Sequence, residues 1–474
     1  VRHGSLACAE VSTRQTASPT AAPVGARRVG TPSGVRRPAR LILAAYAGLV
    51  VVGTALLMLP AATAPGRRTT LVDALFSAAS AVSITGLAVV DTGTHWTLFG
   101  QLVILVLMQV GGLGIMTLAT LVTVIVSGRL ALRSRLLAQA ETRAVSLTNI
   151  RRLLRDIVTF MLVSEAIAAI ILTGWLTFYY REPPARALYD GVFHAVSAFN
   201  NGGLSLYPES MTRFVGDPVI CLTLSFAVIL GGLGYPVVFE LARRGGWRPK
   251  NWSVLTRITV IVSGSLLALG TLAITLAELT NPATLGRLNP GQQVLAGFFH
   301  TAMTRSGGLN TVDVGEMRPA TWFISDVLMF IGGGSASTAG GIKVTTFGLL
   351  AFVLWAEVRG ETSVLVGKRR IPADNQRQAL TVALLSIAVV AVTTLILLAI
   401  TPYSLDRVLF EAVSAFATVG LSTGITGDLN DAATVLLSIL MIVGRVGPLT
   451  VATALALRQR TRRYDRPEER TIIG

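Results

Sequence analysis

Four short segments of the sequence share the residue types that a backbone binding site for a cation requires. They read FSAASAVSITGL at 76–87, FHAVSAFNNGGL at 193–204, FFHTAMTRSGGL at 298–309 and FEAVSAFATVGL at 410–421. Each begins with phenylalanine and ends in Gly-Leu. Backbone carbonyl oxygens can replace the hydration shell of a monovalent cation. Glycine suits such a site because it accepts backbone angles that aim carbonyls inward and adds no side chain to the ion's path.

The four segments recur at nearly constant intervals. Their glycines, Gly86, Gly203, Gly308 and Gly420, are separated by 117, 105 and 112 residues. Each segment is too short to cross a bilayer and ends in turn residues, which predicts a half-helix that enters the membrane and returns as extended chain. Irregular backbone at membrane depth is tolerated only where protein buries it or it lines a water-filled cavity. The alternative for any single copy is a Gly-Leu that only allows close helix packing, but four aligned copies favour four loops around one pore.

The ends of these loops form the predicted selectivity filter. Half-helix C-termini there direct partial negative charge toward a bound cation. The predicted K+ filter residues are Ser83, Ile84, Thr85, Gly86, Asn200, Asn201, Gly202, Gly203, Ser306, Gly307, Gly308, Thr418, Val419 and Gly420.

Long apolar blocks must position these loops. The 474 residues are 52% hydrophobic and 14% charged, with a mean hydropathy of +0.63. A block of about 20 residues can cross a hydrocarbon layer of about 30 Å. We therefore expect an all-α membrane protein with eight transmembrane helices in four helix, pore-loop, helix repeats around one central pore. The expected spans are 41–60, 97–127, 156–180, 217–242, 254–279, 322–356, 379–402 and 432–457.

The net charge of +16 is concentrated at particular places in the chain. Of the 41 basic residues, 30 lie in 1–40, 128–155, 243–257, 356–378 and 458–470, which are the termini and every second loop. Lys/Arg excess in alternate short loops marks the cytoplasmic side. Both termini are therefore expected to be cytoplasmic, contact with membrane lipid is compatible with the charge, and nucleic-acid binding is not expected. The two cysteines and four histidines show no disulfide or metal-ligand spacing.

The expected domains follow the repeats. Residues 1–37 lack hydrophobic periodicity and are predicted to be a disordered basic cytoplasmic arm. The remaining domains are repeat 1 at 38–128, repeat 2 at 129–245, repeat 3 at 246–358 with an intramembrane gating loop at 332–343, repeat 4 at 359–458, and a cytoplasmic tail at 459–474.

The second span of each repeat contains glycines that let a helix bend or pack closely. In the third repeat, residues 332–343 (GGGSASTAGGIK) interrupt an apolar span, so a continuous helix is not expected there. This segment is predicted to be a movable gate. A lipid-facing charge at mid-span costs about 2.5 to 3.5 kcal/mol, so Arg445 is expected to face inward, hydrogen-bond the 332–342 loop and repel cations. The predicted gate residues are Gly332, Gly333, Gly334, Ser335, Ser337, Thr338, Gly340, Gly341, Lys343 and Arg445.

Other charged residues flank the loops. Arg305, inside the third pore loop, is expected to bond pore-helix carbonyls. Three aspartates at the outer starts of pore helices, Asp73, Asp190 and Asp406, are predicted to be helix N-caps. Acids after the loops predict a cation-attracting mouth; they are Asp91, Glu209, Asp217, Asp313, Glu316, Asp428 and Asp431.

The sequence resembles the Trk/Ktr/HKT superfamily of potassium transporters, in its KtrB-type branch of ion-translocating membrane subunits. The resemblance covers about residues 40–457. It rests on TGLAVVDTGTHWTLFGQ (85–101), QVGGLG (109–114), SAFNNGG (197–203), RSGGLNT (305–311), GGGSASTAGGIK (332–343), SAFATVGLSTGIT (414–426) and IVGRVGPLT (442–450).

The resemblance implies a bacterial inner-membrane protein that takes up K+ down its electrochemical gradient, with Na+ assisting in many members. It also implies a homodimer with one pore in each protomer, and a cytosolic KtrA-type ring of RCK (KTN) domains that gates the pore on binding ATP or ADP. Glycine at all four filter positions implies preference for K+, and the family's gating loop and gate arginine correspond to 332–343 and Arg445. Residues 202 and 307 are glycine where the family commonly has alanine.

Three alternatives remain open. A sodium-permeable or poorly selective monovalent cation channel of the same fold is the nearest. A secondary transporter of another fold usually needs ionisable residues deep in its spans, and these are few here. A membrane-embedded enzyme would need a catalytic or metal constellation, which neither the histidines nor the acids form.

Overall fold

Apolar helices make up most of the computed structural model, which describes residues 36–114, 147–243, 249, 252–361, 363–366 and 369–447. Four long helices come first in the four expected repeats: α1 (Arg36–Leu57), α5 (Leu147–Phe178), α9 (Val254–Glu278) and α13 (Ala373–Ile400). Residues 1–35 of the predicted arm and the whole predicted C-terminal tail lie outside the described residues.

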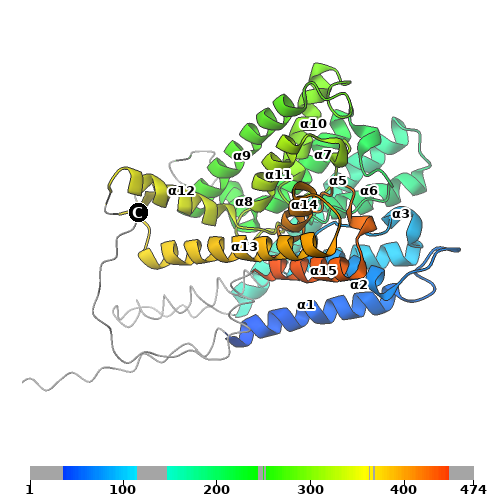
Figure 1. The fold of residues 1–474 in the computed structure, drawn as a ribbon, viewed down its shortest axis with the longest axis horizontal. Coiled ribbons are helices and arrows are strands. Elements are labelled where there is room, and N and C mark those ends of the chain that lie inside the picture. The colour runs from blue at the N-terminus through cyan, green and yellow to red at the C-terminus, as the bar shows by residue number, and fades with distance from the viewer. Residues whose placement is uncertain are drawn as a thin grey trace, which may run out of the picture.

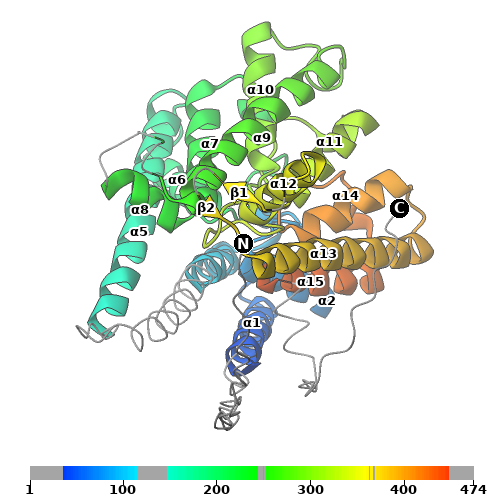
Figure 2. The ribbon, with the colours of Figure 1, turned by 90° about the vertical axis from the view of Figure 1, so that its left-hand side faces the viewer.

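Each long helix is followed by a short helix that contains most of one repeated segment. The short helices are α2 (Leu71–Ser83), α6 (Pro184–Phe199), α10 (Pro290–Met303) and α14 (Leu405–Phe416). Each packs against the long helix that precedes it. Figure 2 shows the resulting groups in chain order around the middle of the molecule, from α1 and α2 in blue to α13, α14 and α15 in orange.

A third helix completes each group. In the first group it spans Leu98–Gly114, as far as the structure describes it. The others are α7 (Pro218–Leu233) with α8 (Tyr235–Arg243), α11 (Pro319–Phe330) with α12 (Val344–Val358), and α15 (Asp431–Val446). Figure 1 shows α1, α13 and α15 running in nearly the same direction, and α15 contacts both of the others.

Small elements connect these helices. They are α3 (Thr92–His95), the short 3-10 helices η1 (Thr212–Phe214), η3 (Val314–Glu316) and η4 (Thr426–Asp428), and the antiparallel strands β1 (Leu365–Val366) and β2 (Arg369–Arg370).

The length of the described helices supports a multi-pass membrane protein. Three described helices are long and apolar enough to cross a membrane, and the bent pair α7 and α8 would make a fourth. Two other expected spans, 97–127 and 432–457, run beyond the described residues, and 322–356 is interrupted. The number of eight spans therefore stays a prediction.

The glycines of the second spans act in two ways. The axes of α7 and α8 differ by 99°, and the chain turns at Gly234, whose φ is +87°. Gly111, Gly231 and Gly444 lie inside helices and pack against the backbone carbonyls of Val82, Phe199 and Phe416. In the fourth repeat α15 ends at Val446, and Gly447 after it has a φ of +92°, close to that of Gly234. In the second and fourth repeats the glycines thus serve both close packing and the end of a helix.

The expected N-caps are wrong in all three cases. Asp73 lies at the third position of α2 and completes a capping box, in which its own N–H donates to the hydroxyl oxygen of the N-cap residue. Asp406 lies at the second position of α14, and Asp190 lies in the middle of α6. The carboxylates of Asp73 and Asp406 lie in the first turn of their helices, where the positive end of the helix dipole stabilises a negative charge. The N-cap positions belong to Thr70, Pro183 and Ser404.

Candidate functional site

The four repeated glycines meet in a closed ring. All four have left-handed backbone angles, with φ of +91° at Gly86, +67° at Gly203, +69° at Gly308 and +95° at Gly420. A Cβ atom on Gly86 would lie 2.8 Å from the Cα of Gly203, and one on Gly203 would lie 3.0 Å from the Cα of Gly308. A Cβ on Gly308 would lie 3.3 Å from the Cα of Gly420, and one on Gly420 2.9 Å from the Cα of Gly86. The ring therefore follows chain order, and only glycine fits it.

The same backbone pattern precedes each glycine. The residue two positions earlier also has a positive φ: 54° at Ile84, 60° at Asn201, 73° at Ser306 and 49° at Thr418. The residue between them does not. In each of these four short segments, called strands here, the positive φ values alternate with a residue of negative φ. Positive φ is uncommon outside glycine and clusters at functional sites, and here it recurs four times at equivalent positions.

Serine hydroxyls hold three of the four strands to their short helices. The N–H groups of Gly86 and Gly420 donate to the hydroxyl oxygens of Ser80 and Ser414, each at 3.1 Å. In the second segment Ser197 donates to the carbonyl of the leucine after the glycine, at 2.8 Å. The third segment has alanine at this position. In the first strand, the hydroxyls of Ser83 and Thr85 lie 2.7 Å apart.

The two unusual glycines are matched by bulky neighbours. A Cβ on Gly202 would lie 2.6 Å from the sulfur of Met108, and one on Gly307 would lie 2.5 Å from the sulfur of Met303. Alanine would not fit either place without movement of these side chains. The methionine side chains fill the space beside these two glycines, so the glycines do not leave the loops loosely packed.

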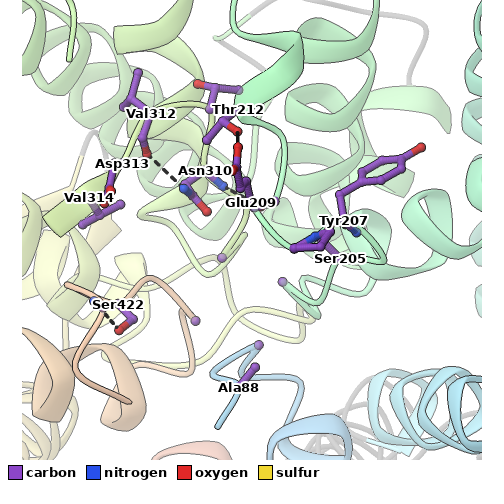
Figure 3. A pocket seen from close by; sticks show the side chains of 18 of the residues that line it. Ala88, Ser205, Tyr207, Glu209, Thr212, Asn310, Val312, Asp313, Val314 and Ser422 are labelled. Carbon is purple, nitrogen blue, oxygen red and sulfur yellow. Dashed lines mark hydrogen bonds between the residues drawn. The ribbon is translucent and has the colours of Figure 1, made fainter. Parts of the chain in front are cut away.

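A cavity of about 850 Å³ lies on one side of the ring, and all four ring glycines line it. Figure 3 shows Ala88, Ser205, Asn310 and Ser422 around this cavity, on the loops that follow the four glycines. Tyr207 also lines it, and burial raises the pKa of its hydroxyl. The tyrosine is therefore neutral at physiological pH and adds no charge to the cavity.

Three of the seven expected mouth acids line the cavity, namely Asp91, Glu209 and Asp313. Asp217 does not: it accepts hydrogen bonds from the indole N–H of Trp175 at 2.7 Å and the hydroxyl of Tyr180 at 2.9 Å. It also caps α7. Its role is therefore structural. The acids outside the described lining are Asp217, Glu316, Asp428 and Asp431.

On the opposite side of the ring, residues 332–343 leave the helix as expected. Ile331 and Ile342 form a parallel bridge, and the N–H of Gly332 donates to the carbonyl of Ile342 at 2.6 Å. The N–H of Val344 donates to the carbonyl of Gly333 at 2.9 Å. The two ends of the segment are thus held together, so the segment forms a closed loop between α11 and α12.

This loop is bonded to the bend between α7 and α8. The N–H of Gly334 donates to the carbonyl of Gly232 at 2.7 Å, and the N–H of Thr338 donates to the carbonyl of Gly231 at 3.2 Å. Within the loop, the Ser337 hydroxyl donates to the carbonyl of Gly334 at 2.7 Å, and Gly341 has a φ of +65°. Beside it, the hydroxyls of Ser335 and Thr345 lie 2.8 Å apart. Because glycine carbonyls and N–H groups make most of these bonds, the small residues allow the backbones to approach closely.

The loop also contacts the strands below the glycine ring. The Thr338 hydroxyl lies 3.1 Å from the Asn201 side-chain amide, and the N–H of Gly340 donates to the Ser306 hydroxyl at 3.1 Å. A Cβ on Gly340 would overlap the hydroxyl oxygen of Thr418. The loop therefore touches the second, third and fourth strands, and its buried backbone lies against their inner ends.

Three cations surround the loop. Arg445 is buried on α15 and donates from its guanidinium to the carbonyl of Thr338, as expected. The ammonium of Lys343 donates to the carbonyl of Ala339 at 2.6 Å. Arg305 was expected to bond pore-helix carbonyls and does not; it donates to the carbonyl of Gly332 at 3.2 Å. Its second bond, at 3.3 Å, goes to the Ser263 hydroxyl on α9. The reason is that its long side chain points away from α10 toward the loop.

A buried polar cluster beside the second strand was not foreseen. The side-chain amide of Asn200 donates to Glu165 on α5 and to Gln109, both at 2.9 Å. Gln109 donates to the other oxygen of Glu165, also at 2.9 Å. A single glutamate within the apolar block 156–180 was the signal that could have revealed it, because such a residue needs a buried partner.

Comparison with known proteins shows the family of this chain. Residues 30–463 match the family model of TrkH, described as a cation transport protein. The chain belongs to the TrkH family of cation transport proteins. The expectation of a transporter rather than an enzyme is confirmed by this membership, and with the apolar helices it makes the chain a multi-pass membrane protein.

Relatives within and near the family extend over almost the whole chain. The Ktr system potassium uptake protein B of Vibrio alginolyticus is 40% identical over 92% of this chain and 94% of its own length. The protein of the same name from Bacillus subtilis is 37% identical over 88% of this chain and 93% of its own length. The crystal structure of the potassium transporter TrkH from Vibrio parahaemolyticus has a TM-score of 0.71 at 20% identity, covering 91% of this chain and 87% of that one. At that identity the likeness is one of fold.

Proposed function

We propose that this chain is the pore-forming membrane subunit of a potassium uptake system, and that K+ passes through the ring of four glycines. The observation that carries the proposal is the ring itself: four left-handed glycines in mutual contact at the base of a cavity of about 850 Å³. Carbonyl oxygens on the strands before them would replace the hydration shell of the ion. The names of the two Ktr relatives, which describe potassium uptake, support K+ as the ion.

The proposal includes eight membrane spans in four pseudo-fourfold repeats. Its support is the recurrence of one backbone pattern, positive φ at the glycine and two residues before it, in four segments on four short helices. Asp91, Glu209 and Asp313 would raise the local concentration of cations in the outer cavity.

The loop 332–343 is proposed to be the gate in its closed position. It contacts three of the four strands on the side away from the cavity, and Arg445 and Lys343 place positive charge beside it. A cation leaving the ring would meet both the backbone of the loop and this charge. Opening therefore requires the loop to leave the strands.

Several features of the assembly are proposed from the resemblance and from the charge pattern. The chain would form a homodimer in a bacterial inner membrane, with both termini cytoplasmic because basic residues gather there. The relatives are named as parts of a Ktr system, which supports a partner subunit. We propose that this partner is a cytosolic KtrA-type ring of RCK domains that binds ATP or ADP and moves the gate, and that Na+ assists uptake.

Complementation tests the function directly. A bacterium that lacks its own potassium uptake systems should grow at limiting K+ when it produces this chain with a candidate regulatory subunit. Failure to grow, with the protein present in the membrane, would contradict potassium uptake. Equal uptake of Na+ and K+ would favour the alternative of a poorly selective cation channel.

Gly86→Ser tests the filter. A Cβ at this position would lie 2.7 Å from the carbonyl oxygen of Gly202, and its φ of +91° is unfavourable for any other residue. Left-handed angles cost a non-glycine residue roughly 1–2 kcal/mol, so the strand should shift and discrimination against Na+ should fall. An unchanged ratio of K+ to Na+ uptake would count against the assignment.

A further inference from the structure

The second residue of each repeated segment differs between the four repeats. It lies in the middle or second half of the short helix that precedes the glycine and the loop after it. These residues are Ser77, His194, Phe299 and Glu411. Two of them make polar contacts with that loop and two do not.

Glu411 on α14 is 1% exposed and accepts hydrogen bonds from three residues of its own loop. One carboxylate oxygen accepts from the Ser422 hydroxyl at 2.5 Å and the Thr423 N–H at 3.0 Å. The other accepts from the Thr426 hydroxyl at 2.8 Å. The Glu411 side chain thus links α14 to the loop at residues 422–426, which follows the fourth ring glycine.

His194 on α6 makes an equivalent link. Its Nδ1 atom lies 2.7 Å from the carbonyl oxygen of Asp190, so Nδ1 must carry the ring proton. Its Nε2 atom is then an acceptor in the neutral ring, and receives the Leu206 N–H at 3.3 Å and contacts the Ser205 hydroxyl at 3.1 Å. Tyr207 stacks on the imidazole with 4.9 Å between ring centroids, which fixes the ring's plane.

The two links are equivalent in position. Ser205 and Ser422 each lie two residues after their glycine, and both line the outer cavity. The backbone N–H that is bound lies three residues after the glycine in both cases. Because the ring follows chain order, the second and fourth repeats lie opposite one another. Within the described residues, the Ser77 side chain makes no such bond, and Phe299 has no polar atom to make one.

We propose that Glu411 and His194 are positioning residues for ion selection, which hold two opposite strands of the filter from their outer ends. The proposal rests on the glycine ring being the filter. A site holds its geometry within about 0.5 Å only when a supporting layer of hydrogen bonds fixes it. Here each link holds the serine side chain two residues after a filter glycine and the backbone N–H three residues after it. The third strand is held at the same place by another loop, since the N–H of Asn310 donates to the Ser210 hydroxyl at 3.2 Å and its carbonyl accepts the Met211 N–H at 2.9 Å.

Glu411→Ala and Glu411→Gln test the fourth repeat. Alanine leaves the Thr423 N–H and two hydroxyls without their acceptor. Glutamine keeps the shape and one acceptor oxygen, and its amide group can donate to Thr426, whose hydroxyl also lies 2.8 Å from Ser422. We expect the K+ over Na+ uptake ratio to fall by about tenfold in Glu411→Ala and to stay within about threefold of wild type in Glu411→Gln.

His194→Asn and His194→Gln test the second repeat with two amides of different reach. The oxygen of glutamine can reach the place of Nε2 and accept from Leu206, whereas that of asparagine cannot. We expect a reduced uptake ratio in His194→Asn and recovery in His194→Gln. This pair keeps the proposal testable if Glu411→Ala does not fold. Ser77→Ala is the matched control, because the same position in the first repeat bears no link, and it should leave the ratio unchanged.

All variants are compared at equal amounts of protein in proteoliposomes, with K+ and Na+ uptake measured separately. A purely structural role would lower the amount of folded protein and leave the ratio of the remainder unchanged, which would overturn the proposal. Equal defects in Glu411→Gln and Glu411→Ala would also overturn it. If Gly86→Ser changes the ratio while these variants do not, only this inference fails. If Gly86→Ser also has no effect, the filter assignment itself fails.

Discussion

Replacement of Arg445 by alanine should open the pore in the absence of any regulatory subunit. The guanidinium donates to the carbonyl of Thr338, and Thr338 is the residue through which the loop also reaches Gly231 and Asn201. Loss of this donor weakens the loop at its contact with the strands. Loss of the charge removes part of the repulsion that a cation would meet there.

The size of the effect follows from the bond that is lost. A hydrogen bond to a charged group contributes about 1.5–3 kcal/mol, and each 1.4 kcal/mol changes an equilibrium tenfold. The ratio of closed to open gates should therefore fall by roughly 10- to 140-fold. The fold should survive, because the Nε atom of Arg445 has no hydrogen-bond partner among the described residues and burial of a charge is costly.

The assay is Rb+ uptake by proteoliposomes that contain the membrane subunit alone. Uptake should rise in Arg445→Ala until most gates are open. Arg445→Lys is the control, because lysine keeps the positive charge and one donor, and its uptake should remain much closer to wild type. Equal uptake by wild type and Arg445→Ala, at equal amounts of folded protein, would refute the role of this contact in closing the pore.

Three further substitutions probe neighbouring features. Gly340→Ala should also raise uptake without the regulator, because the added methyl group overlaps Thr418 and pushes the loop from the strands; unchanged Rb+ uptake would argue against this contact. Gly234→Ala forces a left-handed residue, at a cost of roughly 1–2 kcal/mol, and its Cβ would lie 2.5 Å from the carbonyl oxygen of Ser335, so thermal stability in detergent should fall. Asp217→Asn should lower the free energy of unfolding by roughly 2–3 kcal/mol through lost charged hydrogen bonds without changing the K+ to Na+ ratio, and a changed ratio would place Asp217 in the ion path.

The sequence predicted that the four repeated glycines meet, because the irregular backbone of a re-entrant loop must be kept away from lipid. Four copies of one segment, each ending in Gly-Leu and each between apolar blocks, require their irregular backbone to be shielded from lipid, and a shared centre does this. The interruption at 332–343 was equally predictable, since ten of its twelve residues are glycine, serine, alanine or threonine and do not sustain an apolar helix. The hydrogen bond from Arg445 to this loop was also predictable, because a buried guanidinium needs acceptors and a non-helical loop has carbonyls that are free to accept.

The side-chain partners of the other charged groups could not be read from the sequence. Arg305 lies two residues after the end of α10, and its bond to Gly332 depends on how that turn packs against the 332–343 loop. Two N-caps differ from the prediction because Thr70 and Ser404, which precede Asp73 and Asp406 by three and two residues, are themselves good N-cap residues. The bend at Gly234 reaches 99°, and the 332–343 loop packs against it. This contact joins distant parts of the chain, so the sequence alone does not show it.

The hydrogen bonds that hold the loop have a consequence for how the pore opens with temperature. The N–H groups of Gly334, Thr338 and Gly340 are bonded to three different acceptors, on α7 and on the third strand. A loop held at both ends by the bridge between Ile331 and Ile342 cannot release one of these bonds far without straining the others. Opening should therefore be all-or-none, with a large activation enthalpy. Single-channel recordings would show abrupt openings. The frequency of these openings would rise steeply on warming, while the current through one open pore would change little.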